Sequence, residues 1–141
     1  MIRQAQAEDF FDILELGREF VKAFPYEVTY DDRVTGQTIF AVMENGVIFV
    51  IEEDGIVVGM LGGLINQFFF SEEKYAAELI WYVRPEYRGS VSAKKLPLMF
   101  EAWAKDQGAK HICMASLDKT LDKFYARLGY TLSEQSFHKS L

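Results

Sequence analysis

The sequence predicts an α/β or α+β fold in which helices pack against one mixed β-sheet. Three observations support this prediction. Apolar residues recur at helical spacing in four segments, runs rich in β-branched residues lie between them, and glycine or proline stands at most junctions. The chain has 141 residues, of which 50% are apolar, so it can bury one sizeable core. We therefore expect a single domain over residues 1–141.

The first half of the chain is predicted to form an edge strand, two helices and a β-hairpin. The expected bounds are 2–5 for the strand, 7–24 and 31–43 for the helices, and 47–51 and 56–65 for the hairpin strands. Pro25 ends the first helix, because a proline cannot supply the N–H that a further turn needs. Gly46 tolerates the left-handed backbone at which helices stop, and Asp54-Gly55 is typical of a tight hairpin turn.

The second half is predicted to hold two more helices and the remaining strands. The expected bounds are 77–83 and 111–115 for strands, 92–107 and 119–128 for helices, and 130–141 for one or two final strands. The first of these strands stops at Arg84-Pro85, because proline restricts the residue before it and cannot donate to a sheet. Gly108 and Gly129 follow the two helices as C-terminal stops.

Composition argues against several classes of protein. The formal net charge of −6 disfavours general nucleic-acid binding, which depends on clustered lysine and arginine. No apolar stretch reaches the length of a membrane helix, and the N-terminus lacks the order of a signal peptide. Cys113 is the single cysteine, so no internal disulfide can form, and we expect a buried thiol in a cytoplasmic protein. His111 and His138 lack nearby ligand partners, so no metal site is expected.

One short segment is basic although the chain as a whole is acidic. Between residues 84 and 95 the chain has a single acidic residue and four basic ones, namely Arg84, Arg88, Lys94 and Lys95. This segment joins a strand end to a helix start, where unpaired N–H groups and the positive end of the helix dipole can hold a phosphate. Small residues at Gly89, Ser90, Ser92 and Ala93 allow a close approach, and Ser92 could cap the helix. The alternative is a solvated helix start with ordinary surface charges.

This segment resembles the acetyl-CoA signature of the GNAT N-acetyltransferase superfamily: Arg or Gln, two residues, Gly, one residue, then Gly or Ala. Arg88 and Ala93 match its ends. The Trp-Ala-Lys-x-x-Gly-Ala run at 103–109 and the Phe-Tyr-x-x-x-Gly-Tyr run at 124–130 are also similar to family segments. The resemblance implies the GNAT fold, a mixed, mostly antiparallel sheet of six to seven strands flanked by four helices. Compact members of this family also occur in bacteriophages.

The resemblance also implies a function, the transfer of an acetyl group from acetyl-CoA to a primary amine by direct attack. The residues expected to hold the pyrophosphate are Arg88, Gly89, Ser90, Val91, Ser92 and Ala93. The main chain of Tyr82 and Val83 resembles the part of the family that pairs with the pantetheine arm. Asp118 stands where many relatives carry asparagine and could accept hydrogen bonds from the pantetheine amides; its alternative role is a cap of the last helix.

Two residues are expected to move protons. By resemblance, Tyr125 protonates the departing thiolate, although its ring could instead only pack the last helix against the sheet. Glu78 interrupts an apolar strand, where the family often uses a glutamate as general base; the alternative is a strand-end glutamate in water. Strand alternation predicts that Glu78 shares one face with Ile80 and Tyr82.

Two departures from the family define an alternative function. Val91 stands where the family prefers glycine, and Pro97 falls inside the third predicted helix. Both are compatible with a catalytically inactive protein that keeps this fold and acts through a protein partner.

The acceptor is left open between a small molecule and a protein. The loop from Tyr26 to Tyr30 lies where the family often builds its acceptor site, and its acidic residues suggest a cationic or amine-bearing partner. The run Phe68-Phe69-Phe70 could line an acceptor pocket, form a homodimer surface, or pack against the first two helices.

Overall fold

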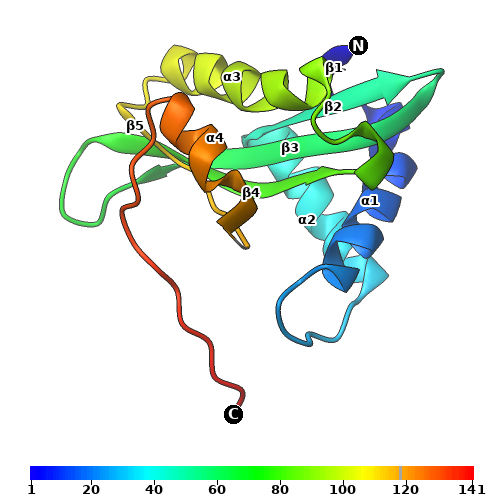
Figure 1. The fold of residues 1–141 in the computed structure, drawn as a ribbon, viewed down its shortest axis with the longest axis horizontal. Coiled ribbons are helices and arrows are strands. Elements are labelled where there is room, and N and C mark those ends of the chain that lie inside the picture. The colour runs from blue at the N-terminus through cyan, green and yellow to red at the C-terminus, as the bar shows by residue number, and fades with distance from the viewer. Residues whose placement is uncertain (118) are drawn as a thin grey trace.

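The computed structural model describes residues 1–117 and 119–141. In this part of the chain, a five-stranded sheet lies between two layers of helices, with α1 and α2 on one face and α3 and α4 on the other (Figure 1). The strands are β1 (Ile2–Gln4), β2 (Val47–Glu53), β3 (Ile56–Gln67), β4 (Lys74–Val83) and β5 (His111–Cys113). The helices are α1 (Phe10–Lys22), α2 (Asp32–Asn45), α3 (Val91–Asp106) and α4 (Asp122–Arg127). The predicted α/β class and its four helices are confirmed.

The sheet is mixed and mostly antiparallel, as predicted. Its order is β1-β2-β3-β4-β5, in which each strand pairs with its neighbours along the chain. The first three pairs are antiparallel, and β4 pairs with β5 in parallel. The parallel pair requires a crossover, which α3 supplies across the sheet face.

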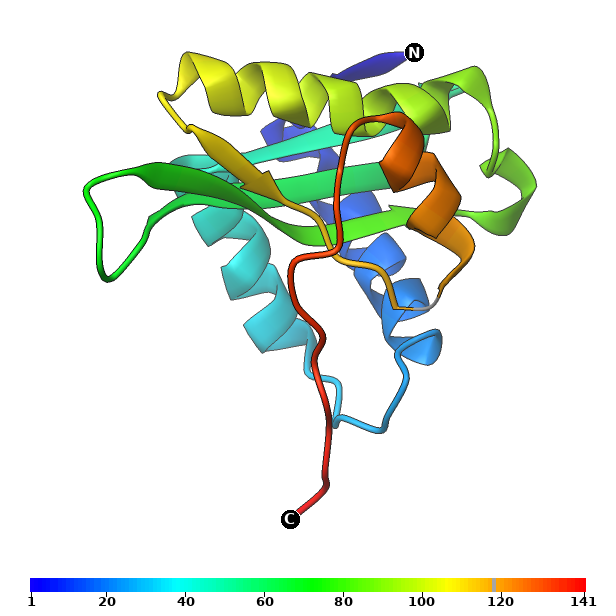
Figure 2. The same ribbon diagram turned by 60° about the vertical axis from the view of Figure 1, so that its left-hand side comes forward.

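The prediction of six to seven strands is wrong within the described residues, because residues 130–141 form no strand. Figure 2 shows this segment leaving the sheet after α4 and running past the α1–α2 connection, where His138 stacks on Tyr26 with ring centroids 3.5 Å apart. Leu132 and Phe137 are 82% and 91% exposed. The segment is polar between these two residues, so it has no continuous apolar face to lay against a sheet edge.

The core has two halves, one on each face of the sheet. The half under α3 is built mainly by Val47, Phe49, Ile51, Leu61, Leu96 and Phe100. The half under α1 and α2 is built mainly by Ile13, Leu16, Ile39, Ile48, Val50 and Met60. Alternation along β2 sends successive residues to opposite halves, which explains why that strand is apolar throughout.

The aromatic run at the β3–β4 turn does not pack against the first two helices. Phe69 and Phe70 are 99% and 72% exposed, and Phe68 packs on Tyr75 and His111 at the β4–β5 edge. The expectation of packing against α1 and α2 is therefore wrong, and a homodimer surface stays a prediction. None of the helices described by the structure is long and apolar enough to cross a membrane.

Candidate active site

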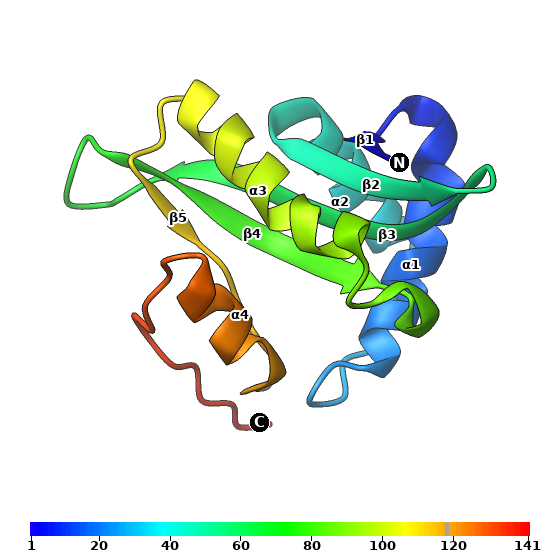
Figure 3. The ribbon, with the colours of Figure 1, turned by 45° about the horizontal axis from the view of Figure 1, so that its top comes forward.

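The site lies where β4 and β5 separate. The two strands pair only from Tyr75 to Ala77 on β4, opposite His111 to Cys113 on β5. Figure 3 shows them diverging beyond this point, on the side of the sheet where α4 lies. The β5-facing edge of β4 from Glu78 to Val83 therefore has no paired strand among the described residues. Its backbone N–H and C=O groups are open to a ligand that can pair as a strand does.

A β-bulge at the start of this open edge turns Glu78 toward α4. On β3, Gly62 pairs with Ile80 and Gly63 pairs with Glu78, so Leu79 is an extra residue in β4. A Cβ at Gly63 would meet the Phe100 ring of α3, and paired residues of antiparallel strands share a face, so Glu78 lies on the α3 face. Ile80 packs with the α1–α2 core instead. The alternation that placed Glu78 beside Ile80 and Tyr82 is therefore wrong, because the bulge shifts the period.

The bulge brings Glu78 and Tyr125 to the same residue. The Glu78 carboxylate accepts a hydrogen bond from the Ala115 N–H at 3.1 Å, and the Tyr125 hydroxyl donates to the Ala115 carbonyl at 2.8 Å. Ala115 follows β5 at the point where that strand has left β4. The two residues expected to move protons, far apart in sequence, thus meet at one residue that sequence reasoning did not single out.

Burial shifts the pKa of both the Glu78 carboxyl and the Tyr125 hydroxyl. It raises the pKa of the Glu78 carboxyl to about 7, against the smaller opposing effect of the Ala115 N–H. At neutral pH this carboxyl can therefore both take up and release a proton. Burial, and then the charge of Glu78, raise the pKa of the Tyr125 hydroxyl well above its ordinary value. Tyr125 stays protonated at neutral pH, as a proton donor must.

Tyr125 also packs the last helix against the sheet. Only 9% of the residue is exposed, and its ring centroid lies 6.1 Å from Trp81 and 5.4 Å from Tyr130. The packing role and the chemical role are compatible, because the ring makes the apolar contacts and the hydroxyl points to Ala115. Packing of this kind fixes the position of the hydroxyl.

The predicted phosphate loop forms the start of α3, with one change. Gly89 has φ +76°, a left-handed backbone with open space where a Cβ would stand. Ser90, rather than Ser92, caps the helix, because its Oγ accepts a hydrogen bond from the Ala93 N–H at 3.1 Å. The N–H groups of Val91 and Ser92 then have no intrahelical acceptor and remain available to an anion. Val91 is 69% exposed.

Arg88 joins this loop to the open edge of β4. Its Nε donates to the Val83 carbonyl at 2.7 Å, and its guanidinium carbon lies 5.4 Å from the Tyr82 ring centroid. Three residues predicted separately as cofactor contacts therefore lie together. Arg88 covers one of the backbone acceptors of the open edge, so a bound ligand would share or replace this contact.

The remaining sequence predictions concern Asp118, the single cysteine and a metal site. Asp118 lies outside the described residues. Cys113 is exposed at the β5 edge rather than buried, because no strand among the described residues covers the outer side of β5. Within residues 1–117 and 119–141, no group of three or more His, Cys, Asp or Glu side chains could hold a metal ion. Sequence reasoning did not single out Trp81, whose indole N–H is buried without a hydrogen-bond partner in the described structure and whose ring lies 5.9 Å from that of Phe124 on α4.

The comparisons with known proteins agree with this fold. The sequence model of the acetyltransferase (GNAT) family matches residues 6–130. No curated protein matches the chain in sequence.

Three solved structures are similar in fold. A predicted acetyltransferase from Clostridium acetobutylicum, solved with acetyl-CoA, has a TM-score of 0.82 at 16% identity, covering 99% of this chain and 95% of that one. Glucosamine-6-phosphate N-acetyltransferase from Arabidopsis thaliana has a TM-score of 0.78 at 19% identity, covering 99% and 97%. An aminoglycoside antibiotic 6'-N-acetyltransferase from Acinetobacter haemolyticus has a TM-score of 0.76 at 20% identity, covering 100% and 97%.

Proposed function

We propose that this chain, which belongs to the acetyltransferase (GNAT) family, transfers an acetyl group from acetyl-CoA to a primary amine. The observation that carries the proposal is the shared tether of Glu78 and Tyr125 to Ala115 beside the open edge of β4. Two of the similar structures are named as acetyltransferases of small amines, a glucosamine phosphate and an aminoglycoside antibiotic. A small-molecule amine is therefore the acceptor we favour over a protein amine.

The residues present fit acetyl-CoA. The start of α3 offers the N–H groups of Val91 and Ser92 beside Gly89, whose backbone leaves open space on the side where a Cβ would stand. The open edge of β4 offers main-chain partners for amide groups, and Arg88 lies between the two. Acetyl-CoA supplies the acetyl group as a reactive thioester when it is bound.

The chain's own residues then perform the proton transfers. Glu78, in its deprotonated form, takes the proton that the acceptor amine loses as it forms the new C–N bond, directly or through one water molecule. Tyr125 donates its phenolic proton to the sulfur of the leaving thiolate as the C–S bond breaks. Tyr125 must exchange its bond to the Ala115 carbonyl for this contact, a short rotation of the hydroxyl. Direct transfer of this kind forms no covalent intermediate with the protein.

The test is calorimetric titration of the purified protein with acetyl-CoA. We expect micromolar binding that Arg88→Ala weakens about tenfold, because charge-assisted hydrogen bonds are lost. Arg33→Ala, an exposed arginine on α2, is the matched control and should bind as the wild type does. Absence of heat and of any thermal shift with acetyl-CoA would contradict the proposal.

That outcome would favour the alternative of a non-catalytic protein that acts through a protein partner. Its structural basis is the start of α3, where Val91 occupies the first helical position. Pro97 lies within the same helix and leaves the Ala93 carbonyl without its usual donor.

A further inference from the structure

A pocket of about 260 Å³ opens on the other face of the sheet, between α1, α2 and β4. Its walls are almost entirely apolar and include Ile13 and Phe20 from α1, Val34 and Ile39 from α2, and Leu79 and Ile80 from β4. No charged side chain lines it. An apolar wall of this kind favours an apolar occupant over a polar one.

The two polar side chains on the α2 wall have already used their donors. The Thr35 hydroxyl donates to the Asp31 carbonyl at 2.9 Å, and the Thr38 hydroxyl donates to the Val34 carbonyl at 3.0 Å. Both hydroxyls thus complete hydrogen bonds of their own helix. A sugar ring in this pocket would leave most of its hydroxyl groups without partners, which disfavours polyhydroxylated acceptors.

The pocket and the proposed reaction site are adjacent at the bulge of β4, with the pocket on the α1–α2 face of the sheet and Glu78 on the α3 face. Leu79 and Ile80 directly follow Glu78, and consecutive Cα atoms are about 3.8 Å apart. Leu79 is the extra residue of the bulge and is 51% exposed, so it stands at the pocket mouth. On the β5 side this stretch of β4 has no paired strand among the residues described. An amine seated by its apolar end can therefore extend its nitrogen past the sheet edge toward Glu78.

The two aspartates at the start of α2 are committed to the protein itself. Asp31 caps α2 by accepting from the Val34 N–H at 3.0 Å. Asp32 binds Arg18 through two hydrogen bonds of 2.6 and 2.9 Å. Their acidity therefore has a structural explanation, which leaves Glu27 as the acidic residue of the α1–α2 connection that could attract a cationic group. None of these three residues lines the pocket, whose walls are apolar.

We infer that this pocket binds the apolar substituent of the acceptor, so that the acceptor class is alkylamines and arylalkylamines. The inference rests on the proposed acetyl transfer for its chemistry and on the pocket for its specificity. The volume is that of roughly nine water molecules at about 30 Å³ each, which suits a phenyl ring or a short alkyl chain.

The experiment compares 2-phenylethylamine and hexylamine with ethanolamine, which has a similar amino group but no apolar end. At saturating acetyl-CoA, kcat/KM should be at least about tenfold higher for each apolar amine, since single apolar groups discriminate on this scale. Leu79→Asp should raise KM for 2-phenylethylamine at least about tenfold and leave acetyl-CoA affinity unchanged. Ile56→Asp is the matched control, because Ile56 is 52% exposed on β3, outside the pocket lining, and its KM should stay within about twofold of wild type.

Direct binding separates this inference from the proposed function. Ligand-observed NMR with 2-phenylethylamine should show binding to the wild type that is lost in Leu79→Asp. Binding without turnover would support the pocket and contradict acetyl transfer, whereas equal use of all three amines would overturn the pocket and leave acetyl transfer in place. A KM that rises as much in Ile56→Asp would also overturn it. If Leu79→Asp does not fold, Thr38→Trp, which fills the mouth from α2, should give the same loss.

Discussion

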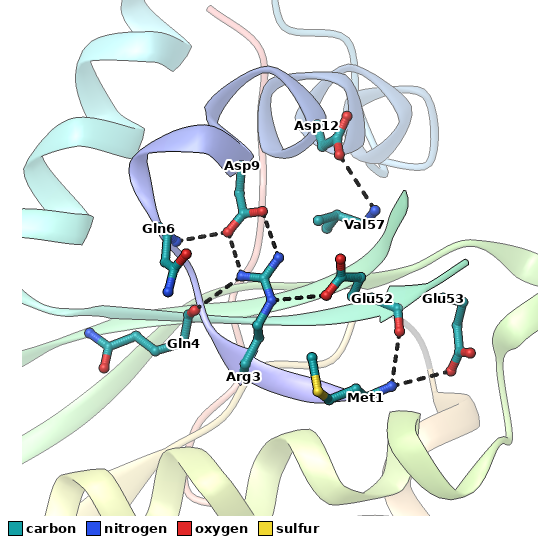
Figure 4. A network of polar contacts seen from close by, with 9 residues as sticks. All are labelled: Met1, Arg3, Gln4, Gln6, Asp9, Asp12, Glu52, Glu53 and Val57. Carbon is teal, nitrogen blue, oxygen red and sulfur yellow. Dashed lines mark hydrogen bonds and ion pairs between the residues drawn. The ribbon is translucent and has the colours of Figure 1, made fainter. Parts of the chain in front are cut away.

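Asp9 is a buried carboxylate and Glu78 a half-buried one at the same sheet, and their surroundings are opposite. Asp9 is 6% exposed and accepts two hydrogen bonds from the Arg3 guanidinium, at 2.7 and 2.9 Å, and one from the Gln6 N–H at 2.7 Å. Figure 4 shows Arg3 between Asp9 and Glu52, which ties β1 to β2 and to the start of α1. Glu78 accepts one bond from the Ala115 N–H and has no cationic partner among the described residues.

The difference shows how a partner decides what a buried carboxylate does. The hydrogen bonds from Arg3 lower the pKa of Asp9 despite its burial, so Asp9 stays charged and ties the start of α1 to the edge strand β1. At the open edge, burial dominates and raises the pKa of Glu78 to about 7. Asp9 is therefore suited to structure, and Glu78 is suited to proton exchange.

The test with the largest expected effect replaces the ionisable carboxyl of Glu78. Glu78→Gln should lower kcat by about a thousandfold, within the range of lost general-base catalysis. In the wild type, kcat/KM should rise with pH through about 7, because Glu78 acts when deprotonated, and this rise should disappear in the variant. Steady-state rates across pH measure both effects, with exposed Glu72→Gln as control. A normal pH profile in Glu78→Gln would remove Glu78 as the base.

The next test removes Arg3, the cationic partner of Asp9. Arg3→Met should destabilise the fold by about 3 kcal/mol, because it leaves Asp9 buried without its cationic partner. Urea denaturation at neutral pH measures the change in the free energy of unfolding. The double variant Arg3→Met/Asp9→Asn should recover most of the loss, and failure to recover it would mean that Arg3 acts chiefly through Glu52 and packing.

A third test concerns Tyr125, whose pKa is raised by burial and by the charge of Glu78. Tyr125→Phe should lower kcat about a hundredfold, while the loss of one hydrogen bond should lower stability by only about 1 kcal/mol. Tyr130→Phe is a matched control, since the Tyr130 hydroxyl is buried and has no hydrogen-bond partner within the described structure. Unchanged turnover in Tyr125→Phe would leave Tyr125 with its packing role alone.

The smallest expected effect is the pH dependence of stability, which should run in opposite directions for the two carboxylates. The folded-state pKa of Asp9 is lowered, so its contribution is present above the ordinary pKa and is lost as the pH falls. The folded-state pKa of Glu78 is raised from 4.5 to about 7, so stability declines as the pH rises across that interval.

Thermal unfolding across pH measures both slopes. Glu78→Gln should raise stability by about 2 kcal/mol above neutral pH, after allowance for the solvent that reaches a half-buried carboxyl. Asp9→Asn should instead reduce the loss of stability that occurs as the pH falls into the acid range. If both variants change stability in the same pH range, the contrast between Asp9 and Glu78 is wrong.

Local spacing predicted most elements of the fold. The predicted helix over residues 31–43 is observed at Asp32–Asn45, and the predicted helix over residues 92–107 at Val91–Asp106, because apolar spacing and stop residues act within a few turns. The Arg88 loop could also be predicted, since a strand end, a turn and a helix start follow one another along the chain.

Contacts between distant segments decided the rest. Ser90 rather than Ser92 became the cap because the helix start depends on how the loop leaves β4. The final segment formed no strand although the outer edge of β5 is free among the described residues, because its polar run offers no continuous apolar face to lay against that edge.

The sequence by itself determined the fold class, because apolar spacing and stop residues are local. Its resemblance to the GNAT family added the candidate phosphate loop and the two candidate proton-moving residues, which stay predictions. Only the tertiary structure decided that Glu78 faces Tyr125, since one extra residue at Leu79 inverts the strand period, and such a bulge exists only when β3 and β4 are paired. The pKa of Glu78 was also decided there, because burial without a cationic partner is a property of the surroundings rather than of the residue.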